Sequence, residues 1–212
     1  HGGRYAFANQ PRIAHWNLVR LAETLLPLLS ENEDEAARLA TAPLQAFPAL
    51  FGAAYARVLR AKLGLFTEED ADGALAEDLL GRLAANEVDY TLFFRRLCAS
   101  AGDEAADARV AALFAEPGAF HEWAERWRQR TAKESVLASD RAASMRRANP
   151  AFIPRNHRLE ELIAAAAERG DFQPFETLTR VLERPYEDQP EHAALGEPPT
   201  REERVRATFC GT

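Results

Sequence analysis

The fold is decided by one stretch near the start of the chain, Pro11-Arg12-Ile13-Ala14-His15-Trp16-Asn17-Leu18-Val19-Arg20-Leu21-Ala22-Glu23-Thr24-Leu25-Leu26. Proline is tolerated in a first helical turn, where its missing N–H would have no partner. The apolar residues that follow leave only a narrow polar stripe, formed by Arg12, His15, Arg20 and Glu23. A helix that is apolar around most of its circumference is normally surrounded by protein. We therefore expect this helix, ended by Pro27 and Ser30, to be buried beneath the helices that follow it.

The rest of the chain repeats apolar residues at three- and four-residue spacings and shows no convincing alternating strand. The pattern predicts further helices from Pro43 to a stop at Gly64, from an N-cap at Thr67, after Asn86, after Asp103, after Pro117-Gly118, over 136–148 as a polar surface helix, and on both sides of a turn at Gly170-Asp171. We predict an all-α fold, a single multi-helix domain over residues 1–212 packed around the buried N-terminal helix. Residues 1–11 are expected to form a loop, and residues 185–212 an irregular tail.

Composition narrows the class of protein. The 212 residues are 47% hydrophobic, which is enough for a real core, and the net charge of -7 argues against a nucleic-acid partner. No apolar run reaches the roughly 18 residues that a membrane-spanning helix needs. Two cysteines make no disulfide scaffold and favour a reducing cytosol. Because the sequence begins at His1 without an initiator methionine or signal sequence, we expect a piece of a longer protein.

Motifs that carry catalytic chemistry are missing or incomplete. We find no glycine-rich phosphate loop and no nucleophile elbow. The run from His121 to Glu125 starts like a zinc-protease helix but lacks the second histidine. The run from Asp70 to Gly73 starts like a calcium loop, but Gly81 stands where the bidentate glutamate belongs, so acidity at a helix start is the better interpretation. We therefore assign no catalytic, cofactor-binding or metal-binding residue.

A few residues have both a functional and a structural interpretation. Basic residues lie close to two tryptophans, as in some nucleic-acid readers, but we favour a solvated helix face over a core face; the residues are Trp123, Arg126, Trp127, Arg128, Arg130 and Lys133. His15 is interpreted as a packed, hydrogen-bonded histidine rather than a base. Arg4 and Asn9 belong to no periodic pattern, and an arginine in such a loop can hold phosphate or carboxylate. We favour a structural tie to upstream chain for this pair.

Several motifs together resemble the selenoprotein O (SelO) family. They are Gly3-Arg4-Tyr5 with Asn9-Gln10-Pro11, Trp16-Asn17-Leu18, Lys62-Leu63-Gly64-Leu65, Asp89-Tyr90-Thr91, Asn149-Pro150 to Arg155-Asn156, Ala167-Glu168-Arg169-Gly170-Asp171 and Arg184-Pro185-Tyr186-Glu187-Asp188. The resemblance covers the whole chain. Pro154, where the family often has leucine, departs from the pattern.

The resemblance implies a kinase-like (pseudokinase) protein that binds ATP with Mg or Mn and transfers AMP to Ser, Thr or Tyr hydroxyls of other proteins. The family's nucleotide and metal residues all precede the Gly3-Arg4-Tyr5 motif, so this chain resembles the helical C-terminal portion and is expected to be inactive alone. Cys210 matches the family's redox residue third from the end, although Gly211-Thr212 departs from the commoner Ser-Ser. The implied location is the bacterial cytoplasm.

The implied partners are the upstream kinase-like core and the protein substrates, with no nucleic acid and no membrane. An uncovered apolar face would also favour self-association of the piece. The alternative function is a non-enzymatic helical module for protein interaction.

Overall fold

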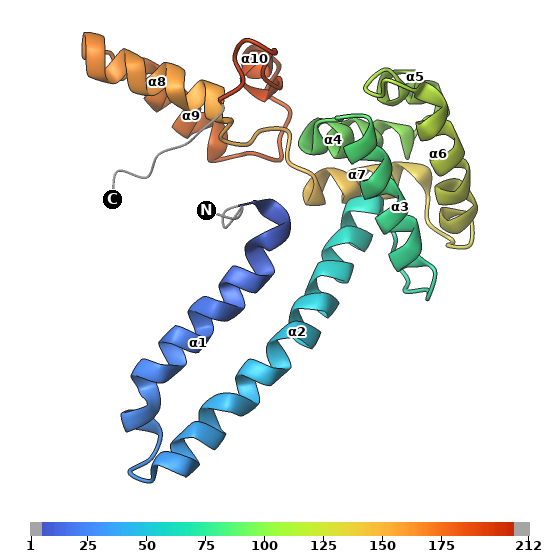
Figure 1. The fold of residues 1–212 in the computed structure, drawn as a ribbon. Helices are drawn as coiled ribbons and strands as arrows, with labels where there is room; N and C mark the ends of the chain where they lie inside the picture. The colour runs from blue at the N-terminus through green and yellow to red at the C-terminus, as the bar shows by residue number, and fades with distance from the viewer. Residues whose placement is uncertain (1–5, 206–212) are drawn as a thin grey trace. The chain divides into compact units, whose positions relative to one another are not determined.

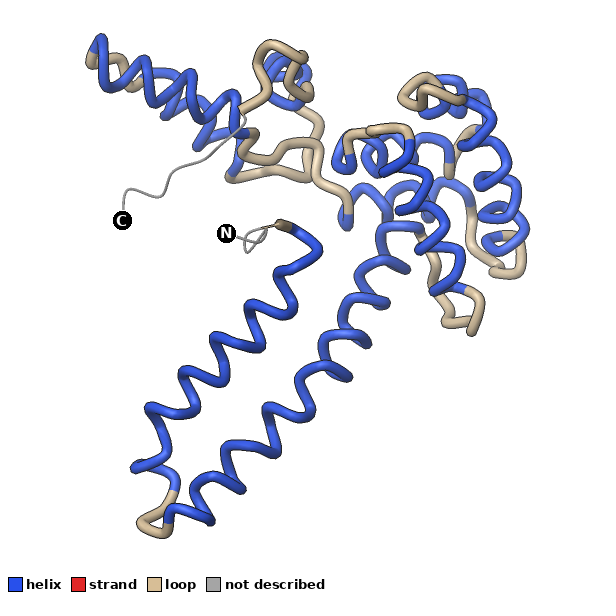
Figure 2. Tube along the Cα trace, viewed as in Figure 1, coloured by secondary structure: helices blue, strands red, loops and turns tan. Residues whose placement is uncertain are grey.

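The computed structural model describes residues 6–205, with only the backbone described for Phe7. All regular elements in this range are helical, which confirms the all-α prediction (Figure 2). The longer helices are α1 (Gln10–Leu29), α2 (Glu33–Leu63), α3 (Asp72–Ala85), α4 (Tyr90–Ser100), α6 (Pro117–Thr131), α7 (Ala138–Ala148), α8 (Asn156–Arg169) and α9 (Gln173–Leu182). Short elements are η1 (Phe7–Asn9), η2 (Glu104–Ala106), α5 (Asp107–Ala111), η3 (Pro190–His192) and α10 (Ala193–Gly196). None of the described helices has both the length and the apolarity to cross a membrane.

The chain divides into two compact units, residues 1–58 and residues 59–212. In the first unit, α1 and the first part of α2 run antiparallel and are joined by a short turn at residues 30–32 (Figure 1). The Asn32 side chain accepts a hydrogen bond from the Glu35 backbone N–H at 2.9 Å, and three acidic residues fill the first turn of α2. An oxygen cap and negative charge both stabilise a helix start. For this reason α2 begins at Glu33 rather than at the predicted Pro43.

The prediction that the first helix is buried is wrong. No residue of α1 is buried, and the exposed fractions of Trp16, Leu21 and Leu28 are 47%, 54% and 81%. Within its unit α1 contacts one helix, through His15, whose Nε2 lies 3.0 Å from the Leu44 carbonyl oxygen of α2. A single neighbouring helix covers one side of a cylinder, so the rest of the apolar circumference stays exposed.

The core lies in the second unit, where α3 packs on α6, and α4 packs on α5 and α7. Its largest fully buried side chains are aromatic: Phe93, Phe94, Phe120, Trp123 and Trp127. The two indole rings stack with centroids 5.7 Å apart. Trp123 donates to the Leu75 carbonyl at 3.0 Å and Trp127 to the Leu63 carbonyl at 2.9 Å. The indole N–H groups thus tie α6 to the helices on either side while the rings fill the core.

Several predicted helix ends are confirmed. Gly64 follows α2 with φ 68°, and Gly170 follows α8 with φ 63°, both in the left-handed region that favours glycine. After Gly170, the Asp171 side chain accepts from the Gln173 backbone N–H, and α8 packs against α9 as the predicted hairpin. Asp103 caps η2 by accepting from the Ala105 N–H.

Two other helix predictions need correction. The helix predicted from Thr67 begins at Asp72 instead, because the Thr67 N–H and hydroxyl both donate to Glu134. The polar helix predicted for the surface is α7, and it contacts α4 and buries Arg141 and Met145. In the tail, the described residues from 185 onward form only η3 and α10.

Candidate functional site

The structure describes only one of the three site residues that the sequence singled out. Arg4 and Cys210 lie outside the described residues. Asn9 ends η1 and stands at the N-cap position of α1, half-buried, with its backbone N–H donating to the Ala6 carbonyl at 2.9 Å. The tie to upstream chain that we favour for Asn9 stays a prediction.

The structural interpretations of His15 and of the tryptophan-rich helix are largely confirmed. The His15 ring stacks on Phe47 with centroids 5.2 Å apart. On α6, Arg128 is bound by Asp107 through two contacts of 2.7 Å, while Arg126 pairs with Asp78. Their side chains are 27% and 47% exposed, as on a solvated face.

Arg130 does not belong to that solvated face, because its side chain is only 6% exposed. It follows Trp123 and Trp127 at positions i+7 and i+3, which places all three on one side of the helix. That spacing is the signal in the sequence that would have identified Arg130 as buried.

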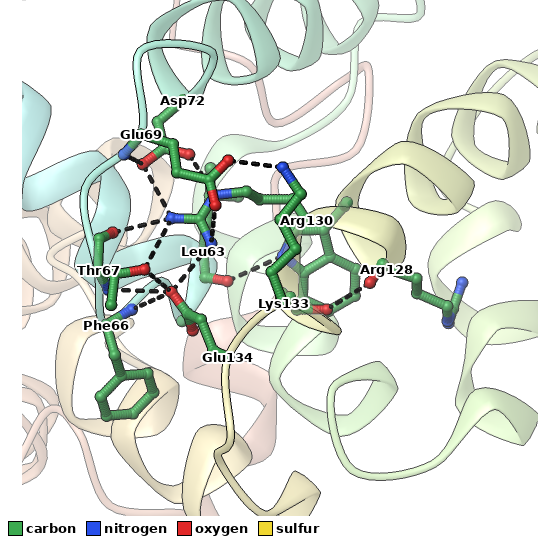
Figure 3. Close-up of polar contacts among 12 residues, drawn as sticks. Leu63, Phe66, Thr67, Glu69, Asp72, Arg128, Arg130, Lys133 and Glu134 are labelled. Atoms are coloured by element: carbon green, nitrogen blue, oxygen red, sulfur yellow. Dashed lines mark hydrogen bonds and ion pairs between the residues drawn. The ribbon is translucent and has the colours of Figure 1, made fainter.

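Arg130 is the centre of a buried charge cluster, defined as Asp72, Arg130, Glu134 and Arg141. Figure 3 labels the first three of these residues. Arg130 Nε donates to Asp72 Oδ1 at 2.6 Å, its Nη1 to Glu134 Oε1 at 3.0 Å, and its Nη2 to the Thr67 carbonyl at 2.9 Å. Asp72 opens α3 and Arg130 lies in the last turn of α6, so this ion pair joins two helices. The arginine fork matches the two carboxylates geometrically.

Glu134 connects the cluster to α7 and to the loop after α2. Its Oε1 accepts from the backbone N–H groups of Phe66 and Thr67, each at 2.9 Å, and its Oε2 accepts from Arg141 Nη1 at 2.8 Å. Arg141 also donates to the carbonyls of Gly64 and Thr131. Every charge in the cluster therefore has an opposite charge and further hydrogen bonds, which is the arrangement that a stable buried ion network requires.

The electrostatics of Glu134 reflect these contacts. Burial would raise its pKa, but the Thr67 backbone N–H, Arg141 and the Thr67 hydroxyl hold the pKa at about 2. Glu134 therefore stays ionised near neutral pH and is unsuited to act as a general base there. Among the described residues no group of three or more His, Cys, Asp or Glu side chains could hold a metal ion. We interpret the charge cluster as a structural tie.

Acid should weaken this tie. The pKa of Glu134 lies below its ordinary 4.5 in the folded protein, so the unfolded chain binds the proton first as the pH falls. Stability from Glu134 is complete above about pH 4.5 and is lost toward pH 2, by about 3 kcal/mol in total. Urea denaturation at a series of pH values measures this loss. Glu134→Gln should show a flatter acid dependence, and an equal loss in both proteins would contradict the assignment.

A second set of contacts surrounds the segment 149–155 before α8. Asn149 is fully buried; its Oδ1 accepts from Lys62 Nζ at 3.0 Å, and its Nδ2 donates to the Lys62 carbonyl at 2.9 Å. Arg155 binds Asp89 at 2.8 and 3.1 Å. Arg95 reaches the carbonyls of Asn149 and Tyr186. These bonds join α2, α4, the segment before α8, and the turn after α9.

Cys98, beside this network, has little reactivity as a thiol. It is 1% exposed, its Sγ donates to the Phe94 carbonyl at 3.2 Å, and burial raises its pKa. A raised pKa keeps the thiol protonated and unreactive.

Comparison with known proteins identifies the family. The family model described as "Protein adenylyltransferase SelO" matches residues 1–183. The chain belongs to the SelO family. A Bradyrhizobium sp. (strain BTAi1) relative named "Protein nucleotidyltransferase YdiU" is 56% identical over 210 residues, 99% of this chain and 43% of the relative. Relatives of the same name from Rhodopseudomonas palustris (strain BisB18) and Methylorubrum populi are 55% and 56% identical, each with 43% of its length covered. The chain thus spans less than half the length of these curated relatives.

The motifs that resemble the SelO family contact one another in the second unit. Lys62 meets Asn149, Asp89 meets Arg155, and Arg95 joins Asn149 to Tyr186. Four of the motifs quoted above are thereby bonded together, although they are distant in sequence. In this SelO chain they act as ties that hold helices in place.

His157 is a residue that the sequence reasoning missed. It lies in the first turn of α8, is 4% exposed, and neither ring nitrogen has a hydrogen-bond partner. Burial lowers its pKa, and nearby Arg158 adds to this effect. An unsatisfied buried polar group costs about 1–3 kcal/mol. In the sequence, His157 is marked only by its position: it follows Arg155-Asn156 at a helix start, shortly after two prolines.

Proposed function

We propose that this chain is the helical C-terminal part of a protein adenylyltransferase that transfers AMP from ATP to Ser, Thr or Tyr hydroxyls of other proteins. The observation that carries the proposal is the match itself, which covers 99% of this chain at 56% identity but only 43% of the relative. We further propose that a kinase-like (pseudokinase) core, with the ATP and Mg or Mn site, lies in the part of the relatives that this chain does not cover.

The charge cluster supports the placement of the nucleotide site elsewhere. The two arginines of the cluster are not available to nucleotide phosphates, because both are occupied by carboxylates and carbonyl oxygens. Phosphate would have to displace Glu134 or Asp72 from buried, well-formed contacts. The role we infer for this part is to support the rest of the enzyme.

We propose that the first unit contacts the part of the enzyme that this chain does not cover. Leu21 and Leu28 of α1 are 54% and 81% exposed, and Leu50 of α2 is 67% exposed. More than half of the relatives' length is available to cover such apolar side chains. We propose that the kinase-like core is the principal partner, that the chain self-associates when the core is absent, and that protein substrates bind transiently. We also propose that Cys210 has a redox role and that the protein acts in the bacterial cytoplasm.

The experiment that tests the proposed function is AMP transfer followed by intact mass. We expect the 212-residue chain to gain no AMP when incubated with ATP and Mg or Mn, because we place the nucleotide site in the part of the relatives that this chain does not cover. The full-length Bradyrhizobium relative, under the same conditions, should modify itself or an added protein. AMP on the short chain would overturn the placement of the site, and no AMP with the full-length relative would overturn the proposed activity. If the short chain gains no AMP but binds a partner protein tightly, the result would favour the alternative of a non-enzymatic interaction module.

A further inference from the structure

We propose that the N-terminal end of α8 binds a phosphate group carried on an apolar body. A pocket opens there, and it is lined by residues of the segment before α8, the first turn of α8, and the segment that follows α10. All of them belong to the second unit. The pocket is separate from the charge cluster, and the proposed enzyme activity does not use it.

The helix end supplies the first part of the argument. α8 has 14 residues and begins at Asn156, and Arg155 at the N-cap position makes no side-chain capping bond. The first turn contains no acidic residue. The first N–H groups of a helix have no intrahelical acceptor, and the helix dipole places positive charge there. A phosphate satisfies both the donors and the dipole.

His157 supplies the second, independent part. It lines the same pocket, it is 96% buried, and its two ring nitrogens have no hydrogen-bond partner. In nearly all proteins such buried polar atoms are paired, and an exception calls for an explanation. A phosphate oxygen at the helix end would give the imidazole N–H an acceptor.

The arginines of the pocket complete the polar side. Arg155 forms a fixed wall, because Asp89 and the Gly196 carbonyl already hold its guanidinium. Arg204 is different: its side chain is 59% exposed, and its contact with Glu87 is long, at 3.7 Å. Its guanidinium therefore keeps donors available for a phosphate, which it can bind bidentately.

The acidic residues near the pocket are already engaged. Asp89 is paired with Arg155, and Glu161 is paired with Arg158 at 2.7 Å. Glu203 accepts from the Thr200 backbone N–H at 2.8 Å, and Glu87 faces Arg204. Arginines thus neutralise Asp89 and Glu161, and the first turn of α8 itself carries no acidic residue.

The pocket also has apolar lining residues, among them Pro154, Pro199 and Val205, and these define the rest of the ligand. Pockets of this mixed kind bind an apolar body through the wall and orient it through a few polar groups. A bare phosphate ion would use only half of the site, whereas an aryl or alkyl phosphate would use both.

The test is an NMR titration of the ¹⁵N-labelled chain at constant ionic strength, with inorganic phosphate and with phenyl phosphate as probes. We expect saturable shifts of the Asn156, His157 and Arg158 amides and of the His157 ring. Phenyl phosphate should bind about tenfold more tightly than inorganic phosphate, since the phenyl ring buries apolar surface. Shifts that do not saturate, or that spread over the whole surface without these amides, would overturn the proposal.

Two variants separate binding from structure. Asn156→Asp places a negative charge at the helix start, so it should weaken phenyl phosphate binding about tenfold while leaving thermal stability equal or higher. Arg204→Ala should weaken binding about threefold, and Arg201→Ala, an exposed arginine of the same segment outside the pocket, should leave it unchanged. Unchanged affinity in Asn156→Asp would refute the site even though that variant folds normally.

Discussion

Replacing Glu134 by alanine should lower the free energy of unfolding by about 3–5 kcal/mol, because two buried arginines would lose their shared carboxylate. Arg130 and Arg141 are each 6% exposed at the side chain, so neither can recover the loss by turning to water. The Phe66 and Thr67 N–H groups would lose their acceptor as well. Urea denaturation at neutral pH, followed by tryptophan fluorescence, measures the change.

Glu122→Ala is the matched control for that experiment. Glu122 also pairs with an arginine, Arg82, at 3.0 Å, but its side chain is 74% exposed. An exposed ion pair contributes little, so the loss should stay below about 1 kcal/mol. If the two variants lose the same amount, the cluster around Arg130 is not a buried tie.

Replacing Trp127 by alanine should cost about 3–5 kcal/mol, the range for removing a large buried aromatic side chain. Trp127 is 1% exposed, stacks on Trp123, and donates to the Leu63 carbonyl at the end of α2. The substitution opens a cavity between α6 and the end of α2 and leaves the carbonyl without that donor. Chemical denaturation followed by circular dichroism would report the change.

The variant Trp127→Phe separates the contribution of ring packing from that of the indole hydrogen bond. It keeps most of the ring packing and removes the N–H donor, so the expected loss is about 1–3 kcal/mol, smaller than for alanine. Equal losses in both variants would show that the hydrogen bond, and not the packing, dominates. A loss below about 1 kcal/mol in Trp127→Ala would show that the indole is not part of the core.

Local signals in the sequence predicted the helices and their ends well. The stops at Gly64 and Gly170 follow from the left-handed backbone that glycine adopts readily, and the cap at Asp103 from its side-chain oxygen. These features depend on a few neighbouring residues. The start of α2 at Glu33 was not predicted, because proline favours a first helical turn and Pro43 lies inside α2, whereas the Asn32 cap and the acidic turn mark the true start.

Burial was predicted less well. The sequence pattern predicted Arg130 and Arg141 as surface charges, because charged side chains are rarely buried without partners. Glu134 is near both in sequence, but their other partners are not. Asp72 is 58 residues before Arg130, and Gly64 is 77 residues before Arg141. The orphan nitrogens of His157 could not be predicted, since a missing partner is a property of the folded surroundings.

By itself the sequence determined the all-α class, the hairpin at Gly170-Asp171 and membership of the SelO family, because local backbone preferences and motif identity are written in neighbouring residues. Only the tertiary structure decided which apolar and charged faces are covered. It left α1 partly exposed, placed Arg130 among carboxylates, and opened a pocket at the start of α8. Burial and charge pairing depend on which distant segment packs against a face, and periodicity within one helix carries no information about that segment.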